Sequence, residues 1–164
     1  MRKIIYGILC LVSMFCVVKV SATCSYSNSY NAVDGGGNIH YDGNSNYNAV
    51  FNYALGKWND RGHVNIAEDT IFTEQDLEYY DDWAVNEPWG GAYAWVNPGI
   101  DYIIINTWKF AYLTTDERQM VMLHEWGHAL SLAHSTTGNV MFRYITDQDT
   151  LGSQDISTYN CLWS

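Results

Sequence analysis

Basic residues are scarce in this chain. Only 8 of its 164 residues are Lys or Arg, against 18 Asp or Glu, which gives a formal net charge of −10. Three of the cations, Arg2, Lys3 and Lys19, lie in the first 22 residues, which hold no acids, and subtracting their charges from −10 leaves −13 for the rest. Such an acidic chain repels polyanions, so we expect no nucleic-acid partner and no binding to anionic membranes.

Long hydrophobic runs are also missing after residue 22, where no segment approaches the length of a membrane span. The first 22 residues differ, because two cations precede a long apolar stretch and a small-residue pattern ends at Ala22. This layout predicts a cleavable signal peptide over residues 1–22. An uncleaved anchor is the alternative, since residues 4–18 are near the short end of what crosses a bilayer. We expect residues 23–164 to be secreted and soluble, without stable membrane association.

Cysteine is sparse in the exported part. Cys10 and Cys16 leave with the signal, so Cys24 and Cys161 remain near opposite ends of the chain. Thiols of exported proteins oxidise, and we predict a disulfide between these two. The alternative is a free Cys24 thiolate that blocks a metal in a latent form, although residues 25–27 show no inhibitory motif.

No repeat, low-complexity segment or linker interrupts residues 23–164, so we expect one domain with an α+β fold. Thr114 and Glu117 have the spacing of a capping box, which favours a helix from about residue 115 to Leu130. Periodicity and turn signals predict the other elements. They are a strand near 38–41, a helix over 47–58, one or two strands between 64 and 73, an acid-rich loop over 74–82, and a hairpin of strands 91–96 and 102–106. A calcium site in the acidic loop is possible in composition but has no ligand spacing to support it.

The chemistry is concentrated in HEWGHALSLAH, from His124 to His134. His124 and His128 are four residues apart on the predicted helix, so both imidazoles project from one face and can bind one ion. Glu125 is near enough to reach a metal-bound water, where a base is needed. His134 follows six residues after His128, so the helix must stop near Ser131 and the chain must fold back.

Three neutral imidazoles leave one tetrahedral position open, which distinguishes a catalytic zinc site from a closed structural one. Zn²⁺ lowers the pKa of a bound water to about 7. Glu125 can take the proton of that water as it attacks a scissile carbonyl, then deliver it to the leaving amine. We therefore predict Zn²⁺ as the cofactor and peptide hydrolysis as the reaction. His40 and His63 lack ligand spacing, and we interpret each as a surface or hydrogen-bonding histidine.

This arrangement resembles the metzincin clan of zinc peptidases, whose pattern is H-E-x-x-H-x-x-G-x-x-H followed by a methionine turn. The residues that match the motif are His124, Glu125, His128 and His134. Met141 is placed like the methionine beneath the zinc, and the Ser135 that follows the last histidine favours the matrixin branch. The resemblance implies a zincin-like domain with a twisted mixed sheet, an early helix and an active-site helix. It also implies a polypeptide substrate that pairs with the edge strand at 91–96.

The sequence departs from that pattern in three places. Ser131 stands in the glycine position, where the backbone readily takes positive φ. Branches that use a tyrosine near the zinc place it where this chain has Arg143, and Tyr144 is one residue later. We predict Tyr144 as transition-state support or as a wall of the specificity pocket formed by residues 142–148. No propeptide lies between Ala22 and the domain, so latency is expected to come from elsewhere or to be absent.

Three functions are compatible with these residues. The first is a monomeric, active zinc endopeptidase, and the second is a narrowly specific toxin or processing enzyme with the same site. The third is a secreted binding module in which the seven Trp and thirteen Tyr residues line a binding surface and the zinc is structural or vestigial. Glu125 favours an enzyme, because a vestigial site has no chemical reason to retain a base beside three ligands.

Overall fold

A computed structural model of the protein describes residues 24–83 and 90–164. The signal peptide predicted over residues 1–22 lies outside them. The strands are β1 (Asn38–Asn44), β2 (Asn65–Glu68), β3 (Leu77–Asp82), β4 (Gly91–Ala94) and β5 (Asp101–Asn106). The helices are α1 (Asn48–Asn59), α2 (Thr107–Phe110), α3 (Thr115–Ala129) and α4 (Ser153–Trp163). None of these helices is long and apolar enough to cross a bilayer.

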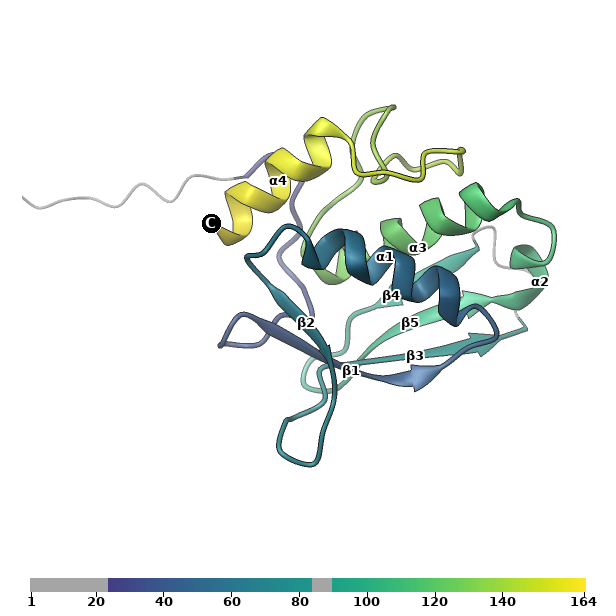
Figure 1. Ribbon diagram of the computed structural model, residues 1–164. Coiled ribbons are helices and arrows are strands. Elements are labelled where there is room, and N and C mark those ends of the chain that lie inside the picture. The colour runs from purple at the N-terminus through teal and green to yellow at the C-terminus, as the bar shows by residue number, and fades with distance from the viewer. Residues whose placement is uncertain (1–23, 84–89) are drawn as a thin grey trace, which may run out of the picture.

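The five strands form one mixed sheet in the order β2-β1-β3-β5-β4 (Figure 1). Pairs β2–β1, β1–β3 and β3–β5 are parallel, whereas β4 runs antiparallel to β5. The predicted hairpin is therefore confirmed, with residues 95–100 as its connection. Because β4 is the last strand in the order, its outer edge is available for pairing.

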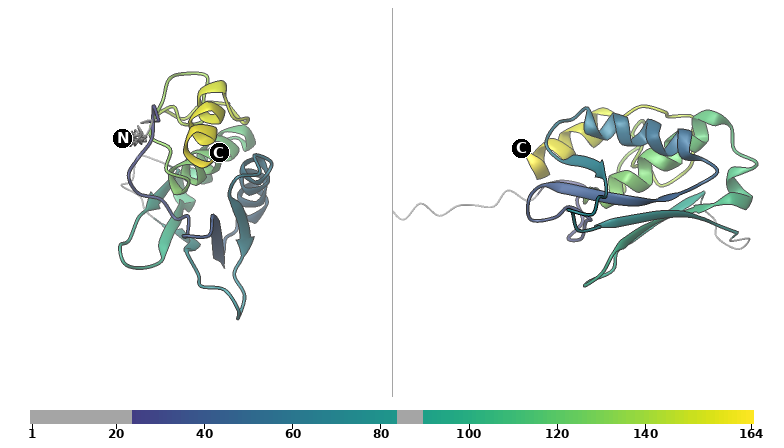
Figure 2. Two further views of the ribbon diagram at one scale, coloured as in Figure 1. Left: turned by 90° about the vertical axis from the view of Figure 1, so that its left-hand side faces the viewer. Right: turned by 60° about the horizontal axis from the view of Figure 1, so that its bottom comes forward.

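Helices α1 and α3 cover one face of this sheet, and no helix of the described residues covers the other (Figure 2). The core lies between these layers. Phe51 and Trp58 of α1, Trp126 of α3, and Leu77 and Ile103 of the sheet are fully buried. The observed arrangement confirms the expected α+β class with an early helix, a mixed sheet and a later helix that carries the histidine motif.

The prediction of an acid-rich loop over residues 74–82 holds for residues 74–76 and is wrong for residues 77–82. Residues Leu77–Asp82 form β3, which lies in the middle of the sheet between β1 and β5. Leu77 and Tyr79 point into the core and are 0% and 6% exposed, whereas Glu78 and Tyr80 alternate with them and are only half-buried. Glu78 and Asp82 face the side without helices, whereas Asp81 lies on the other face and accepts from the Ser45 hydroxyl and the Asn46 backbone before α1. The alternation of buried and less buried residues that marks a strand was therefore not apparent from the acidic composition of the segment.

Two further features of the structure differ from the predicted elements. Residues 70–73 form a turn rather than a strand, with the Thr73 hydroxyl donating to Asp69. Ile104 of β5 is half-buried, whereas Ile103 and Ile105 on the opposite face are fully buried. The helices α2 and α4 have no counterpart among the predicted elements.

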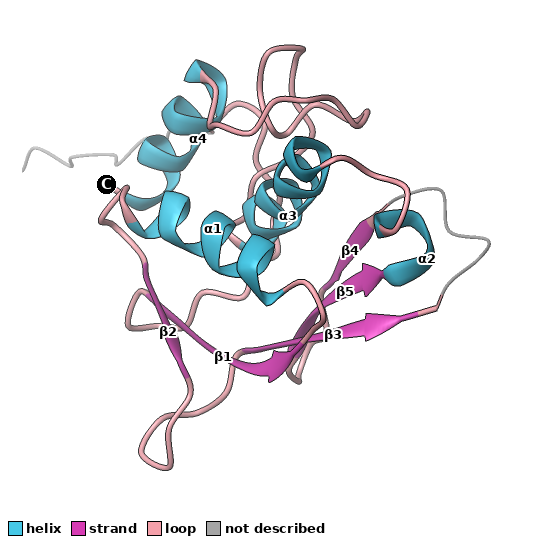
Figure 3. Ribbon diagram, turned by 45° about the vertical axis from the view of Figure 1, so that its right-hand side comes forward, coloured by secondary structure: helices cyan, strands magenta, loops and turns pink. Residues whose placement is uncertain are grey.

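Helix α4 closes the domain beside α1 (Figure 3). Tyr159 of α4 lies with its ring centroid 5.7 Å from that of Trp58, and its hydroxyl accepts from the backbone N–H of Val64 at 2.9 Å. A disulfide joins Cys161 of this helix to Cys24 at the start of the described chain. The N-terminal segment is thereby attached to the last helix.

Two helical glycines allow a matched test of packing. A Cβ on Gly127 of α3 would overlap Met141 Sδ, whereas a Cβ on Gly56 of α1 meets nothing within 4 Å. Alanine favours a helix over glycine by about 1 kcal/mol at either site. We expect Gly56→Ala to raise the free energy of unfolding by up to about 1 kcal/mol and Gly127→Ala to lower it by about 2 kcal/mol through overpacking. Urea unfolding checks both, and equal effects at the two sites would contradict the packing.

Candidate metal centre

Helix α3 begins where its sequence signal predicts. The Thr114 side chain accepts from the backbone N–H of Glu117, and the Glu117 carboxylate accepts from the backbone N–H of Thr114 at 2.7 Å, so the capping box is confirmed. From this start the helix carries His124 and His128 on one face, with ring centroids 4.6 Å apart. His134 joins them from the following loop, 5.1 and 5.0 Å away by the same measure. One ligand nitrogen from each ring lies within 4.8 Å of the others.

Backbone carbonyls orient two of these rings. His124 Nδ1 is 2.7 Å from the Val140 carbonyl oxygen, and His128 Nδ1 is 2.8 Å from that of Leu132. A carbonyl oxygen can only accept, so each Nδ1 carries the proton and each Nε2 keeps its lone pair. Metal-binding histidines commonly have such a second hydrogen bond, which fixes the tautomer. The donor set therefore fits a zinc ion.

Burial keeps the imidazoles of His124 and His128 neutral. It lowers the pKa of His124 to about 3 and that of His128 to about 4, because the charged form is poorly solvated there and a neighbouring imidazole disfavours a second charge. The pKa of His134 is also lowered, first by burial and then by the charge of Arg143. Neutral imidazole is the form that binds a metal.

The turn that delivers His134 is made by Ser131. Its φ of 70° lies in the left-handed region, which costs energy for a residue with a Cβ. The N-terminal segment braces this conformation: Asn28 N–H donates to the Ser131 carbonyl at 2.7 Å, and the Ser131 hydroxyl donates to the Asn28 carbonyl at 2.8 Å. The hydroxyl thus supplies a hydrogen bond that glycine could not make.

Met141 is 1% exposed and lies against Gly127 of α3, one residue before His128. Its loop is held by Asp155 of α4, whose carboxylate accepts from the backbone N–H groups of Val140 at 2.8 Å and Met141 at 3.2 Å. The same Val140 offers its carbonyl to His124. A carboxylate near the C-terminus therefore positions a ligand on α3 through two hydrogen bonds.

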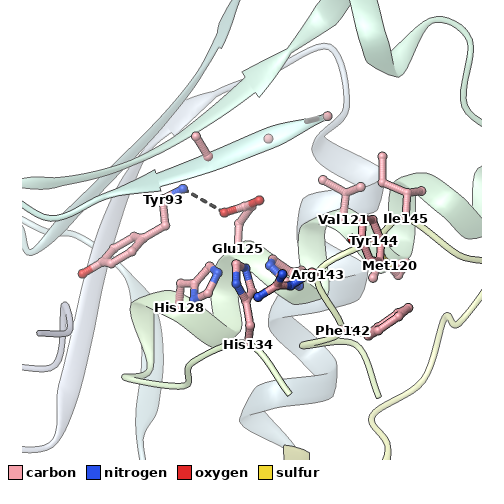
Figure 4. Close-up of a pocket in the computed structure, with 14 residues that line it drawn as sticks. Tyr93, Met120, Val121, Glu125, His128, His134, Phe142, Arg143, Tyr144 and Ile145 are labelled. Atoms are coloured by element: carbon pink, nitrogen blue, oxygen red, sulfur yellow. Dashed lines mark hydrogen bonds between the residues drawn. The ribbon is translucent and has the colours of Figure 1, made fainter. Parts of the chain in front are cut away.

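Glu125 is buried among the ligands and is 6% exposed. Figure 4 shows its carboxylate directed toward β4, where Oε2 accepts from the backbone N–H of Tyr93 at 2.8 Å. Burial raises the pKa of Glu125 to about 7, and the hydrogen bond from Tyr93 opposes this shift. A carboxyl group with this pKa can both take and return a proton near neutral pH.

A cavity of about 210 Å³ adjoins the three histidines and Glu125. Apolar side chains line much of it, including Met120, Val121 and Ile145. Tyr144 also lines it, is 58% exposed, and lies with its ring centroid 5.4 Å from that of Phe142. This placement favours a wall of the pocket, while its transition-state role stays a prediction.

The profile of the matrixin peptidase family matches residues 26–164 of the sequence. The chain belongs to the matrixin family. This confirms the metzincin resemblance and its matrixin-like branch. No curated protein sequence matches this matrixin.

A solved structure shares the fold of this matrixin. It is the GM1-bound form of the ECX AB5 holotoxin, in which one chain superposes with a TM-score of 0.58 at 14% sequence identity. The match covers 85% of this chain and 86% of the other. At such low identity the likeness is one of fold alone.

The structure adds three groups that the sequence patterns did not single out. They are the Tyr93 amide on Glu125, the Asp155 carboxylate under the methionine loop, and Gly127, which makes room for Met141. Only Gly127 had a visible signal, since glycine inside a helix usually marks close packing. Of the two histidines outside the motif, His63 lies against Tyr159, with ring centroids 5.8 Å apart, and His40 lies beside Asp76.

The serine turn predicts a specific pair of mutational effects. Ser131→Ala keeps the strained backbone but loses the hydrogen bond to Asn28, so we expect the free energy of unfolding to fall by about 1–2 kcal/mol. Ser131→Gly loses the same bond but relaxes the backbone, and we expect it to stay within about 1 kcal/mol of wild type. Urea unfolding of the metal-free proteins measures both. Indistinguishable stability of Ser131→Ala and wild type would argue against the brace.

Zinc binding should tolerate mild acid. Three imidazoles with an ordinary pKa of about 6.5 would together lose about 1,000-fold in apparent affinity between pH 7.5 and 5.5, since each becomes mostly protonated. All three ligands here have lowered pKa values, so protons compete only at lower pH. We expect the apparent affinity to fall by less than about tenfold, measured by competition with a zinc indicator. A 1,000-fold fall would show that the ligands are not desolvated.

Proposed function

We propose that this matrixin is a secreted, zinc-dependent endopeptidase that hydrolyses peptide bonds, with Glu125 as the catalytic base. The observation that carries this proposal is the buried Glu125 carboxylate in the same cavity as three histidines that present lone pairs. Zinc held by His124, His128 and His134 would supply Lewis-acid polarisation and a more acidic water. A structural zinc site would need neither the adjoining cavity nor a base beside it.

Glu125 has one oxygen fixed and one available. Oε2 accepts from the Tyr93 amide, which leaves Oε1 to take a proton from the attacking water. The same oxygen then gives the proton to the amide nitrogen as the peptide bond breaks. Burial raises the pKa of the Glu125 carboxyl to about 7, close to that of a zinc-bound water, which suits it to accept that proton at neutral pH.

The substrate is expected to lie as an extended strand along β4. That strand is the edge of the sheet, and the Tyr93 amide on Glu125 shows that its outer edge faces the cavity. An added strand would bring its scissile carbonyl beside Glu125 and one side chain over the cavity. The volume of about 210 Å³ and the apolar lining by Met120, Val121 and Ile145 favour an apolar side chain there. Phe142 and Tyr144 complete the wall, as expected of the segment 142–148.

The proposed secretion and oligomeric state rest on the sequence and on the family. The signal peptide and the disulfide support secretion, and we propose a monomer whose partner is its polypeptide substrate. Cleavage profiling with a peptide library separates a broad endopeptidase from a narrowly specific toxin or processing enzyme. A binding module with a structural zinc predicts instead that no peptide is cleaved at any concentration of enzyme.

Removing the base tests the mechanism directly. Glu125→Gln keeps the size of the side chain but cannot take a proton, so kcat/KM should fall by about 10³-fold or more while zinc stays bound. Glu68→Gln serves as a matched control, because Glu68 is exposed at the end of β2, and it should leave activity unchanged. Fluorogenic peptides measure activity and mass spectrometry of the intact protein measures zinc. Full activity of Glu125→Gln would show that Glu125 is not the catalytic base. Inactivity of the zinc-loaded wild type on a broad peptide library would favour the binding module.

A further inference from the structure

His40 belongs to a second cluster of metal-ligating side chains, at the end of the sheet where β1 and β3 begin. It faces Asp34, which precedes β1, and Asp76, which precedes β3. Each residue offers one ligand atom, and the three atoms lie within 4.8 Å of one another. All three side chains are half-buried. The imidazole nitrogen distinguishes this group from a cluster of carboxylates alone.

The distances within this cluster suit ligands of one ion. His40 Nδ1 is 3.3 Å from Asp76 Oδ2. Two ligands bound to tetrahedral zinc at their usual bond lengths stand about 3.3–3.5 Å apart. The measured separation is that of a hydrogen-bonded imidazole–carboxylate pair, and it also matches the spacing of two neighbouring ligands.

Backbone amides hold both carboxylates in place. Asp34 Oδ1 accepts from the N–H groups of Gly36 and Asn38, each at 2.8 Å. Asp76 Oδ2 accepts from the N–H of His40, also at 2.8 Å. Asp76 Oδ2 has both this backbone hydrogen bond and the contact with His40 Nδ1, and Asp34 Oδ2 accepts from the Asn38 side-chain amide at 3.4 Å. Such fixed orientation is what outer hydrogen bonds provide at metal sites.

An open polar cavity of about 400 Å³ adjoins the cluster. Asp34 and Asp76 line it together with Glu74, and no Lys or Arg is among its lining residues. The cavity gives an ion access from solvent and leaves room for water to complete its coordination. The two carboxylates also repel each other, and the charge of Asp34 is one cause, after burial, of the raised pKa of Asp76. A cation between them would relieve this repulsion.

We propose that Asp34, His40 and Asp76 form a second binding site for a divalent transition-metal ion, separate from the His124 centre, with zinc as its natural probe. One imidazole and two carboxylates are a ligand set that zinc accepts, whereas calcium takes oxygen ligands alone. The ion would tie the starts of β1 and β3 together with the turn that precedes β1. Its role is structural, and it does not depend on the proposed peptidase activity.

Zinc stoichiometry of the disulfide-bonded protein tests this site. Wild type should bind two zinc ions by calorimetry and elemental analysis, and His40→Gln, Asp34→Asn and Asp76→Asn should each bind one. Asparagine keeps an oxygen that accepts from the backbone, so these two variants preserve the local hydrogen bonds. His63→Gln is the matched control and should still bind two. His128→Gln should lose the zinc of the His124 centre and keep one ion, which separates this proposal from the proposed function.

Other outcomes of these measurements would contradict the second zinc site. Wild type that binds a single zinc, lost in His128→Gln, would overturn the second site, and so would His40→Gln that still binds two. Binding of calcium in preference to zinc at this cluster would overturn the assignment to a transition metal. NMR of the wild type avoids any dependence on the folding of variants. The His40 imidazole resonances should shift on zinc titration while those of His63 stay in place, and an unchanged His40 would contradict the proposal.

Discussion

The reversal of the chain at Ser131 is the constraint on which the metal centre depends. A helix can place His124 and His128 on one face, but it cannot bring a residue six positions later to the same point. The chain must leave the helix through a left-handed conformation, and here a serine adopts it. Its hydroxyl and carbonyl are both held by Asn28. A residue that is unfavourable by backbone preference alone thus becomes acceptable because a distant segment stabilises it.

Local signals in the sequence predicted the elements whose causes are local. The capping box at Thr114, the hairpin turn before β5 and the spacing of His124 and His128 each depend on a few neighbouring residues, and each is present in the structure. The family resemblance supplied Met141 and the return of His134, which no periodicity could place. The disulfide between Cys24 and Cys161 was predicted because thiols of exported proteins oxidise and these are the two cysteines that follow the predicted signal peptide.

Features that depend on tertiary context could not be predicted in this way. The strand β3 has acidic residues on both faces: Glu78 and Asp82 lie on the face without helices, and Asp81 accepts from Ser45 and Asn46, which composition could not indicate. Asp155 and the Tyr93 amide act on groups 15 and 32 residues away in sequence. His40 had no ligand spacing in the sequence, and only the parallel pairing of β1 with β3 brings it beside Asp76. In each case the missing information is which distant segments become neighbours.

The attachment of the metal centre to both ends of the chain has a consequence for biosynthesis. The turn that presents His134 is held by Asn28 from the beginning of the domain, and the loop that orients His124 is held by Asp155 near its end. A nascent chain that still lacks α4 has every motif residue but not the support for His124. The His124 ring is therefore oriented only when the eleven-residue helix α4 has been made and docked.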